Sequence, residues 1–568
     1  RGPAVTGDNH VELLWASPGP GSWVLDQAHK ATSVTLPWQD VFPTAMAEGF
    51  RSWTARYGLP LSHIEVGYVN GYGYLRPLPA GVHDTGRAGP PPAFVLKILV
   101  RLVPELRHRA GAARVARAER IWRADARRWW GETRPARVAT NLVVQAVEVG
   151  RLDDAELAAH LRLATAELRG GLVEHFDLIG AIALPVGDLV LTAEGWGIGP
   201  TESLGLLRGA TPASAGLARS LSRVGTLLAA AGTTVTSLDD IAPTSPAGVA
   251  LEEALRLHRW RLLAGADLDA PTIEEMPNLV AALIDVGKKG ITEAGEAQAG
   301  IDAIRARAPA DERAIFDQLL AEACAGYALR DDNVGVCVQW PAGLLRRGLL
   351  EAGHRLVARG AIDAAEHVLD LHVDETVALV AGDPGGGGLD AVTVAARVQA
   401  RSAADSATPP VQLGARVAPA PDPSAFPPAM AENVRAIDAY RRLADGDVRP
   451  GESRGTGVGT RRHRGRAVVV AEAAEALERL VLGDVLVIAT TNPCVNPALA
   501  LAGAVVTEQG GLLCHTAIAA RELDLPAVVG LADACRLIPD GATIEVDPAS
   551  GTVAVLSTSS TGEGPPPS

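Results

Sequence analysis

The sequence predicts a multidomain chain in which a mainly α-helical region precedes a smaller C-terminal α/β domain. The chain has 568 residues and 47% of them are hydrophobic, which is enough for about three domains with sizeable cores. Apolar residues recur at three- and four-residue spacing over 114–130 and 154–176, and this is the period of an α-helix. After residue 467, short apolar runs alternate with helical segments, as in α/β domains.

The composition argues against several classes of protein. A formal net charge of -14 disfavours sequence-independent binding of nucleic acid, because such binding needs a basic surface. Five cysteines without C-x-x-C spacing predict neither a metal site nor a disulfide framework, and favour a reducing cytoplasm. No apolar run reaches the roughly 18 residues that span a bilayer, and Asp8, His10 and Glu12 interrupt any signal-peptide core. We therefore expect a cytoplasmic protein without a membrane partner.

The pattern along the chain divides it into five parts. The expected boundaries are 1–100 for a mixed N-terminal part, 101–380 for the helical domain, 381–450 for a Gly/Pro-rich linker, 451–557 for the α/β domain and 558–568 for a disordered tail. Helix breaks are expected near 331–333 and 340–341. Within the linker, residues 407–430 are rich in proline and predict an extended connector, followed by a short helix over 431–445. The first residue is Arg1 rather than Met, which leaves open whether native residues precede it.

The α/β domain is expected to contain six short buried strands. They are 467–471, 484–489, 504–507, 527–530, 543–547 and 553–556. A helix is expected over 516–523. The Gly-rich residues 455–460 do not form a G-x-G-x-x-G fingerprint and follow no clear strand, so we interpret them as a hinge loop.

A glycine pair and a histidine stand between the third of these strands and the helix. Gly510 and Gly511 predict a turn in which backbone N–H groups can approach a ligand without obstruction. A helix that opens beside His515 would supply unpaired N–H groups and the positive end of its dipole, which both favour a phosphoryl group. A neutral imidazole is a good nucleophile and afterwards a good leaving group. The alternative is an ordinary histidine at a helix start.

The segment 504–530 resembles the mobile phosphohistidine domain of phosphoenolpyruvate-utilising enzymes. The family pattern is Gly-Gly, two residues, Ser or Thr, His, then Ala-Ile, Ala-Arg-Glu and Pro-Ala-Val-Val-Gly, and only Cys514 departs from it. The likeness covers about 455–555 and implies a swivelling domain in which His515 is catalytic and carries a covalent phosphoryl group. The implied phosphate-site support is Thr507, Gly510, Gly511, Cys514, Thr516 and Arg521. A thiol donates only weak hydrogen bonds, and Arg521 is equally suited to hold Glu522 or a domain interface.

The first four hundred residues resemble, more loosely, the acceptor-binding domain of rifampin phosphotransferase-like proteins. The strongest stretch is Tyr327-Ala-Leu-Arg-Asp-Asp-Asn333, followed by Leu345-Arg-Arg347. The implied acceptor-domain candidates are Asp26, His29, Asn70, Arg330, Asp332, Arg346, Arg347 and Arg355. The first two could orient or deprotonate an acceptor hydroxyl, and the arginines suit phosphate oxygens. A helical salt-bridge ladder explains the spacing of Arg347, Glu351 and Arg355 equally well.

The resemblance also implies partners. We find no ATP-grasp segment and no P-loop, so ATP and Mg²⁺ are expected to bind a separate ATP-grasp partner or a missing portion of the gene product. The leading hypothesis is a phosphotransferase in which the β-phosphoryl group of ATP passes to His515 and then to a small-molecule acceptor bound by the helical domain. One alternative is a biosynthetic enzyme that phosphorylates a hydroxyl or carboxyl for elimination or condensation. The other is a regulatory or scaffold protein with a vestigial carrier domain.

Overall fold

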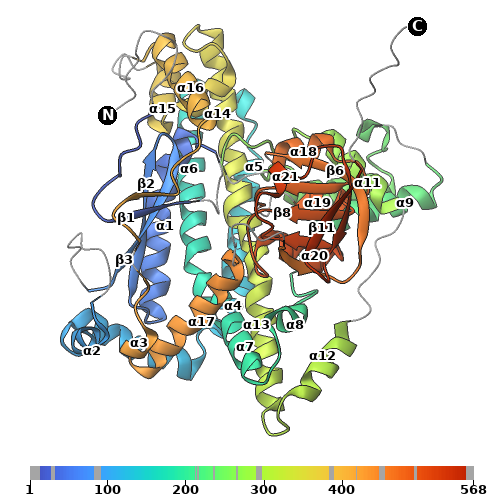
Figure 1. Ribbon diagram of the computed structural model, residues 1–568. Helices are drawn as coiled ribbons and strands as arrows, with labels where there is room; N and C mark the ends of the chain where they lie inside the picture. The colour runs from blue at the N-terminus through green and yellow to red at the C-terminus, as the bar shows by residue number, and fades with distance from the viewer. Residues whose placement is uncertain are drawn as a thin grey trace, which may run out of the picture. The chain divides into compact units, whose positions relative to one another are not determined.

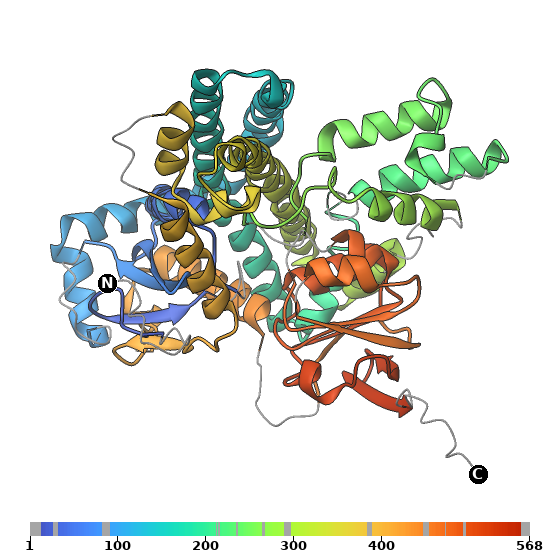
Figure 2. The ribbon, with the colours of Figure 1, turned by 90° about the horizontal axis from the view of Figure 1, so that it is seen from above.

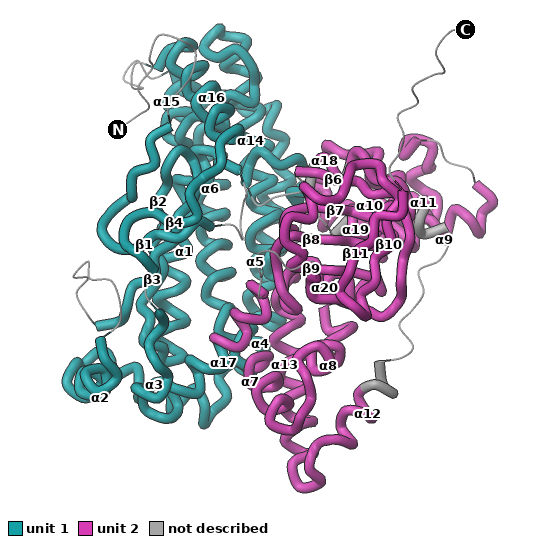
Figure 3. Tube along the Cα trace, in the orientation of Figure 1, with its two compact units in different colours: residues 1–184, 260–271, 333–437 teal, residues 185–259, 272–332, 438–568 magenta. Residues whose placement is uncertain are grey.

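The protein is divided into two compact units (Figure 3). Unit 1 comprises residues 1–184, 260–271 and 333–437, and unit 2 comprises residues 185–259, 272–332 and 438–568. The computed structural model describes residues 13–26, 32–81, 91–211, 213, 216–233, 237–263, 267–288, 297–382, 389–417, 419–446, 454–471, 473–491 and 496–557. The helical region predicted over 101–380 contributes to both units.

Unit 1 is built around two long helices, α1 (Leu36–Arg56) and α6 (Asp154–Asp177), which pack against each other (Figure 1). Asp153 begins α6 with a capping box, since its carboxylate accepts the Glu156 N–H at 2.8 Å while the Glu156 carboxylate accepts the Asp153 N–H at 2.9 Å. The other helical segments assigned wholly to unit 1 are α2 (Ala93–Leu102), α3 (Pro104–Glu119), α4 (Trp122–Arg128), η1 (Trp129–Thr133), α5 (Arg134–Gln145), η2 (Val149–Arg151), η5 (Gly335–Gln339), α14 (Trp340–Ala358), η6 (Ala365–Asp370), α15 (Val373–Ala381), α16 (Ala391–Asp405) and η7 (Pro423–Ala425).

A four-stranded antiparallel sheet completes unit 1, with strand order β2-β3-β1-β4. The strands are β1 (Ser22–Leu25), β2 (Leu61–Val69), β3 (Tyr72–Pro79) and β4 (Gln412–Gly414). In β4, Leu413 pairs with Trp23 of β1, and both side chains lie in one apolar cluster. The stretch 381–450, predicted as a linker, therefore contains α16, β4 and all of α17 (Pro428–Asp445). The proline-rich composition of this stretch did not predict β4, an edge strand that is stabilised by pairing with the distant strand β1.

The hairpin between β2 and β3 turns at Asn70 and Gly71. Both residues have positive φ angles, 51° and 81°, as a two-residue turn matched to the strand twist requires. The Asn70 side chain donates to the Leu14 carbonyl at 3.1 Å. These contacts give Asn70, an acceptor-site candidate, a local structural role in the turn.

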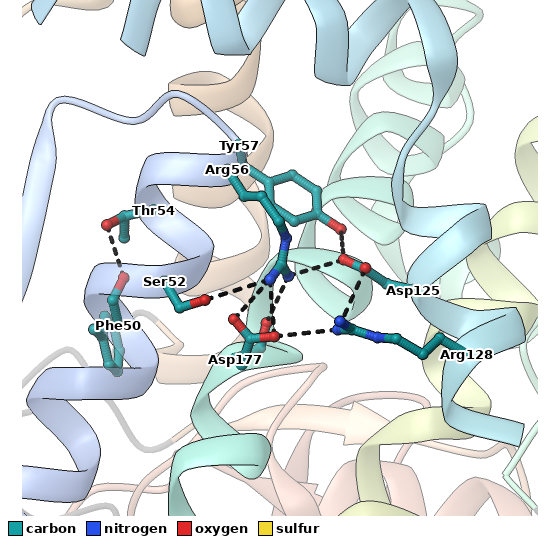
Figure 4. A network of polar contacts seen from close by, with 8 residues as sticks. All are labelled: Phe50, Ser52, Thr54, Arg56, Tyr57, Asp125, Arg128 and Asp177. Atoms are coloured by element: carbon teal, nitrogen blue, oxygen red, sulfur yellow. Dashed lines mark hydrogen bonds and ion pairs between the residues drawn. The ribbon is translucent and has the colours of Figure 1, made fainter. Parts of the chain in front are cut away.

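An ion-pair network joins three helices of unit 1 (Figure 4). Arg56 at the end of α1 contacts Asp177 of α6 at 2.9 Å and Asp125 of α4 at 3.0 Å. Tyr57 donates its phenol hydrogen to Asp125 at 2.8 Å, and Arg128 reaches Asp177 at 3.3 Å. Burial, and next the Asp125 charge, raise the pKa of Tyr57, so the phenol stays protonated as a donor at neutral pH. The network fixes the register between these helices.

Asp125→Asn is expected to lower the free energy of unfolding of unit 1 by about 1–3 kcal/mol, because it removes a buried charge on which Arg56 and Tyr57 both converge. Urea titrations followed by tryptophan fluorescence will measure the change. The control is Glu119→Gln, at an exposed residue of the neighbouring helix α3. It should leave the urea midpoint of unfolding unchanged. Equal midpoints for the two variants would show that the network adds no stability.

One helix of the described residues, spanning Asp154–Gly195, is long and apolar enough by length and composition to cross a membrane. It comprises α6 and α7 (Ile179–Gly195). Most of its apolar window is buried within the structure, and α6 packs against α1, α14 and α15. Packing in a protein core accounts for this composition. No such helix was expected from the sequence, because polar residues interrupt the apolar run.

The predicted helix breaks near 331–333 and 340–341 are wrong. Helix α13 (Arg313–Val334) continues through the π-helix η5 into α14. Pro341 falls in the first turn of α14, and the wider π-turn before it accommodates the missing N–H donor. The amide of Asn141 donates to the Val336 carbonyl at 2.9 Å and so satisfies an acceptor in the irregular turn.

Unit 2 contains a seven-stranded sheet with order β11-β10-β6-β7-β8-β9-β5, drawn in orange and red in Figure 2. Its strands are β5 (Thr456–Val458), β6 (His463–Val470), β7 (Val485–Ile488), β8 (Ala504–Thr507), β9 (Ala527–Val529), β10 (Thr543–Asp547) and β11 (Thr552–Ser557). The four strands β6 to β9 are parallel and the others antiparallel. Buried valines, isoleucines and alanines of these strands form the core, as expected for a parallel sheet covered on both faces.

The six predicted strands are present, but the predicted hinge loop over 455–460 is wrong. Residues 456–458 form β5, which pairs antiparallel with β9. A Cβ atom at Gly457 would lie 1.7 Å from the Pro548 carbonyl oxygen, so the glycine permits close packing of two backbones. The glycine content therefore reflects packing at a sheet edge, which local sequence does not distinguish from a loop.

Helices make up most of the rest of unit 2. Those outside the α/β domain are α8 (Pro200–Gly205), α9 (Gly216–Ala230), η4 (Leu238–Asp240), α10 (Pro246–His258), α11 (Pro277–Lys288) and α12 (Ala297–Arg307), together with most of α13. Those inside it are α18 (Ala473–Arg479), α19 (Asn496–Leu501), α20 (His515–Leu523) and α21 (Ala534–Leu537).

Candidate active site

The candidate site lies where β8 leads through a glycine turn into α20. Cys514 is the N-cap residue of α20, and its Sγ accepts the Ala517 N–H at 3.5 Å. Sulfur is a weak acceptor, yet it occupies the position where Ser or Thr oxygens usually cap a helix. Gly510 has a φ angle of 104°, and a Cβ there would lie 2.7 Å from the Cys514 Cβ. The turn thus needs glycine both for its backbone angle and for its packing.

The glycine turn is fixed to the end of helix α17. Gly511 donates its N–H to the Ala444 carbonyl at 3.0 Å, and Leu513 donates to the Leu443 carbonyl at 2.7 Å. These acceptors are carbonyls of the last helical turn, which lack partners within a helix. We expected the Gly511 N–H to face a ligand, but the structure directs it to α17. This pairing could not be inferred from the sequence, because α17 is separated from the turn by the first half of the domain.

His515 is the first residue of α20 and is 4% exposed. Burial lowers the pKa of its imidazole to about 4, while the Asp331 carboxylate opposes this shift and the Arg330 guanidinium adds to it. An imidazole with this pKa is neutral at pH 7. The structure therefore places a neutral, potentially nucleophilic ring at a helix N-terminus, where the helix dipole favours negative charge.

Arg330, which acts on His515, also acts on the neighbouring residues Cys514 and Tyr327, together with Arg521. The charges of Arg330 and Arg521 both act on Cys514, the neighbour of His515, although burial raises the pKa of that thiol overall. Both arginines also act on Tyr327, which is 1% exposed and whose pKa is raised by burial. Arg521 Nη1 donates to the Leu512 carbonyl at 2.6 Å. Among the described residues, Arg521 Nη2 and the Tyr327 hydroxyl have no hydrogen-bond partner, and buried donors of this kind normally bind an acceptor.

The remaining phosphate-site candidates have contacts inside the domain. The Thr507 hydroxyl is buried and donates to the Gln509 carbonyl at 2.8 Å. The Thr516 hydroxyl forms a hydrogen bond with that of Thr491. Thr507 therefore orders the loop that precedes His515, and Thr516 connects the start of α20 to the loop after β7.

The acceptor-domain candidates are distributed over both units. Arg330 and Asp332 lie on α13 in unit 2, where Arg330 Nη1 is 3.7 Å from Asp331 Oδ1 and Asp332 is 7% exposed. The structure thus brings Arg330 to His515. Asp26 is buried at the end of β1 in unit 1, and its N–H donates to the Gly73 carbonyl at 2.8 Å. His29 lies outside the described residues.

The other three arginines hold elements of unit 1 together. Arg346 donates to the Leu268 carbonyl at 2.8 Å. Arg347 donates to two carbonyls at the end of α5 and stacks over Trp260 at 4.6 Å. Arg355 pairs with Glu351 at 2.8 Å and with Asp154 at 3.1 Å. The expected ladder forms between Glu351 and Arg355, while Arg347 turns to helix α5.

Sequence reasoning overlooked two residues of the site, Tyr327 and Asp331. Both belong to the segment that carries Arg330, one helical turn before it and directly after it. A tyrosine three residues from an arginine on a helix lies on the same face, and this spacing was the available signal. Among the described residues, no group of three His, Cys, Asp or Glu side chains could hold a metal ion.

Comparison with known proteins defines the class of the domain. Residues 481–551 match the family described as PEP-utilising enzyme, mobile domain. The C-terminal α/β domain therefore contains a mobile domain of the kind found in PEP-utilising enzymes.

Three relatives illustrate the extent of this likeness. A rifampicin phosphotransferase of Streptomyces sp is 30% identical over 344 residues, which is 56% of this chain and 36% of the relative. A phosphoenolpyruvate synthase of Aeropyrum pernix is 44% identical over 89 residues, or 16% of this chain and 11% of the relative. An uncharacterized protein of Mycobacterium tuberculosis is 34% identical over 213 residues, or 38% and 22%. The chain spans well under half the length of each of these relatives.

Proposed function

We propose that the protein is a phosphotransferase component that carries a phosphoryl group on His515. The observation that carries the proposal is a neutral, buried imidazole at the start of α20, on which Arg330 acts, while Arg330 and Arg521 both act on the adjacent Cys514. The matched mobile-domain family and the rifampicin phosphotransferase relative support the same chemistry. The donor is ATP bound by an ATP-grasp partner, and the acceptor is a small molecule bound by the helical region.

The reaction has two half-reactions. In the first, an imidazole nitrogen of His515 forms a bond to the β-phosphorus of ATP, and the bond from that phosphorus to the AMP oxygen breaks. Hydrolysis then releases the former γ-group as phosphate, so the products are AMP, phosphate and phosphohistidine. In the second, an acceptor hydroxyl forms a new O–P bond as the N–P bond breaks, the hydroxyl proton is released to solvent, and the neutral imidazole is restored. His515 returns to its starting state.

The chain's own residues bind and orient the phosphoryl group in this scheme. Arg330 and the Nη2 group of Arg521 supply planar, charged donors to its oxygens, and the Tyr327 hydroxyl supplies a neutral one. Mg²⁺ shields phosphate charge in such transfers. In line with the family resemblance, we place Mg²⁺ and the nucleotide on the partner.

The proposal is tested by intact mass and acid lability. The purified chain is incubated with Mg²⁺-ATP, alone and with a candidate ATP-grasp protein. We expect one acid-labile phosphoryl group per chain, and only when the partner is present. Labelling without the partner would place a nucleotide site on this chain and overturn the split architecture. The absence of labelling with a partner that is active on another carrier would contradict the carrier role.

A further inference from the structure

The far end of α20 carries a buried carboxylate, Glu522, two helical turns from His515. Its side chain is 1% exposed. Glu522 Oε1 accepts the Gly209 N–H at 2.9 Å and the Thr211 N–H at 3.3 Å. Because a buried carboxylate is costly unless such donors satisfy it, these contacts account for its position.

The segment that receives Glu522 lies outside the mobile domain but within unit 2. Residues 206–211 follow α8 and precede α9 (Figure 1). Gly209 has a φ angle of 82°, which turns its N–H and that of Thr211 toward one carboxylate oxygen. Arg219 of α9 lies 3.8 Å from Glu522 Oε2. The segment thus offers two backbone donors, and α9 one cation, to an acidic side chain.

A second acidic residue of the same helix end binds the same segment. Asp524, which ends α20 in the left-handed conformation, lies 3.1 Å from Arg208. Helix α19 of the mobile domain also packs against α9 and α11. The mobile domain therefore contacts the helical part of unit 2 through α19 and through the end of α20, in addition to the bonds between the glycine turn and α17.

The fold of α20 does not by itself require acidic residues at its end. Carboxylates near a helix C-terminus oppose the helix dipole, and burial raises the pKa of Glu522. The dipole effect acts in the isolated domain as well, whereas the burial is that of the whole chain. The contacts with Gly209, Thr211 and Arg219 compensate for them, and these contacts exist only when the domain is docked.

We propose that Glu522 docks the mobile domain onto the 206–211 segment and so positions His515 beside Arg330 on α13. The effect on phosphoryl transfer rests on the proposed function, whereas the docking contact itself does not. Release of Glu522 exposes His515 to solvent, and engagement of Glu522 covers it. Glu522 is thus a positioning residue, acting on His515 through the orientation of the domain.

Hydrogen–deuterium exchange on the full chain tests the proposal. In Glu522→Ala, amide exchange at Gly209, Thr211 and the start of α20 is expected to accelerate by about tenfold to a hundredfold, because two hydrogen bonds to a charged acceptor are lost. Glu522→Gln, which keeps the shape of the side chain, should give a smaller increase at the same amides. Glu478→Gln, an exposed change on α18 of the same domain, is the control and should leave these amides unchanged.

A second measurement follows the exposure of His515. Modification of His515 by diethyl pyrocarbonate should be slow in the native chain and faster in both Glu522 variants. Unchanged exchange and unchanged modification in Glu522→Gln, with a native circular dichroism spectrum, would overturn the docking role even if Glu522→Ala fails to fold. Should His515 take up no phosphoryl group while exchange still responds to Glu522, the proposed function fails and the docking contact stands.

Discussion

His515→Ala is expected to abolish acid-labile phosphorylation completely, the largest effect on activity of any single substitution in the chain. The variant removes the only group that we propose to bond to phosphorus, so no residual rate is expected from the neighbouring arginines. Intact mass of the variant after incubation with Mg²⁺-ATP and the ATP-grasp partner measures the result. His463→Ala is the matched control, because His463 lies in β6 of the same domain and contacts the Gly483 carbonyl.

The low pKa of His515 adds a pH dependence to this prediction. The pKa is about 4 in the folded state and near 6.5 in an unfolded chain. Below pH 6.5, His515 binds a proton in the unfolded chain but not in the folded one. The free energy of unfolding therefore falls as the pH drops from 6.5 toward 4, by up to roughly 3 kcal/mol. Unfolding free energies between pH 7 and 4 should therefore fall less steeply in His515→Ala than in the native chain. Identical slopes would mean that the ring is not held neutral by burial.

Local sequence predicted the centre of the mobile domain well, because buried parallel strands and a helix start carry strong local signals. Strand β8 has the predicted ends, 504 and 507, and α20 begins one residue before its expected start. Strand β8 has four consecutive buried residues, three of them apolar, and such a run is typical of a central parallel strand. By contrast, β5 was taken for a loop, since its pairing with β9 and the close approach of Gly457 to Pro548 depend on distant residues.

The side-chain environment of the candidate site was predictable only in part. Arg330 was selected for its charge, and it acts on His515 in the structure. Arg347 was selected on the same grounds, but it stacks on Trp260 and donates to the end of α5. Both residues offer the same guanidinium, and the local sequence does not reveal which acceptor each one meets after folding. For the same reason, the sequence showed that Glu522 belongs to the family motif but did not show its contact with residues 206–211.

Gly511→Ala is expected to cause the largest loss of stability among substitutions near the site, about 3–5 kcal/mol of unfolding free energy. A Cβ at this position would lie 2.5 Å from the Leu443 carbonyl oxygen and 2.7 Å from the Gly446 Cα. Both are backbone atoms, which cannot move aside as a flexible side chain can. The turn must therefore separate from α17, and the hydrogen bonds of Gly511 and Leu513 to that helix are lost with it.

The same substitution at a different glycine separates this effect from the intrinsic cost of alanine. Gly111 lies within helix α3, and a Cβ at that position would meet nothing within 4 Å, so Gly111→Ala should be neutral or stabilise by about 0.5–1 kcal/mol through helix propensity. Chemical denaturation of both variants will compare their free energies of unfolding. Phosphoryl uptake by Gly511→Ala will show whether His515 can still be phosphorylated. A stable Gly511→Ala with normal uptake would show that the turn can leave α17 without consequence for the carrier, and that its attachment there is not needed to present His515.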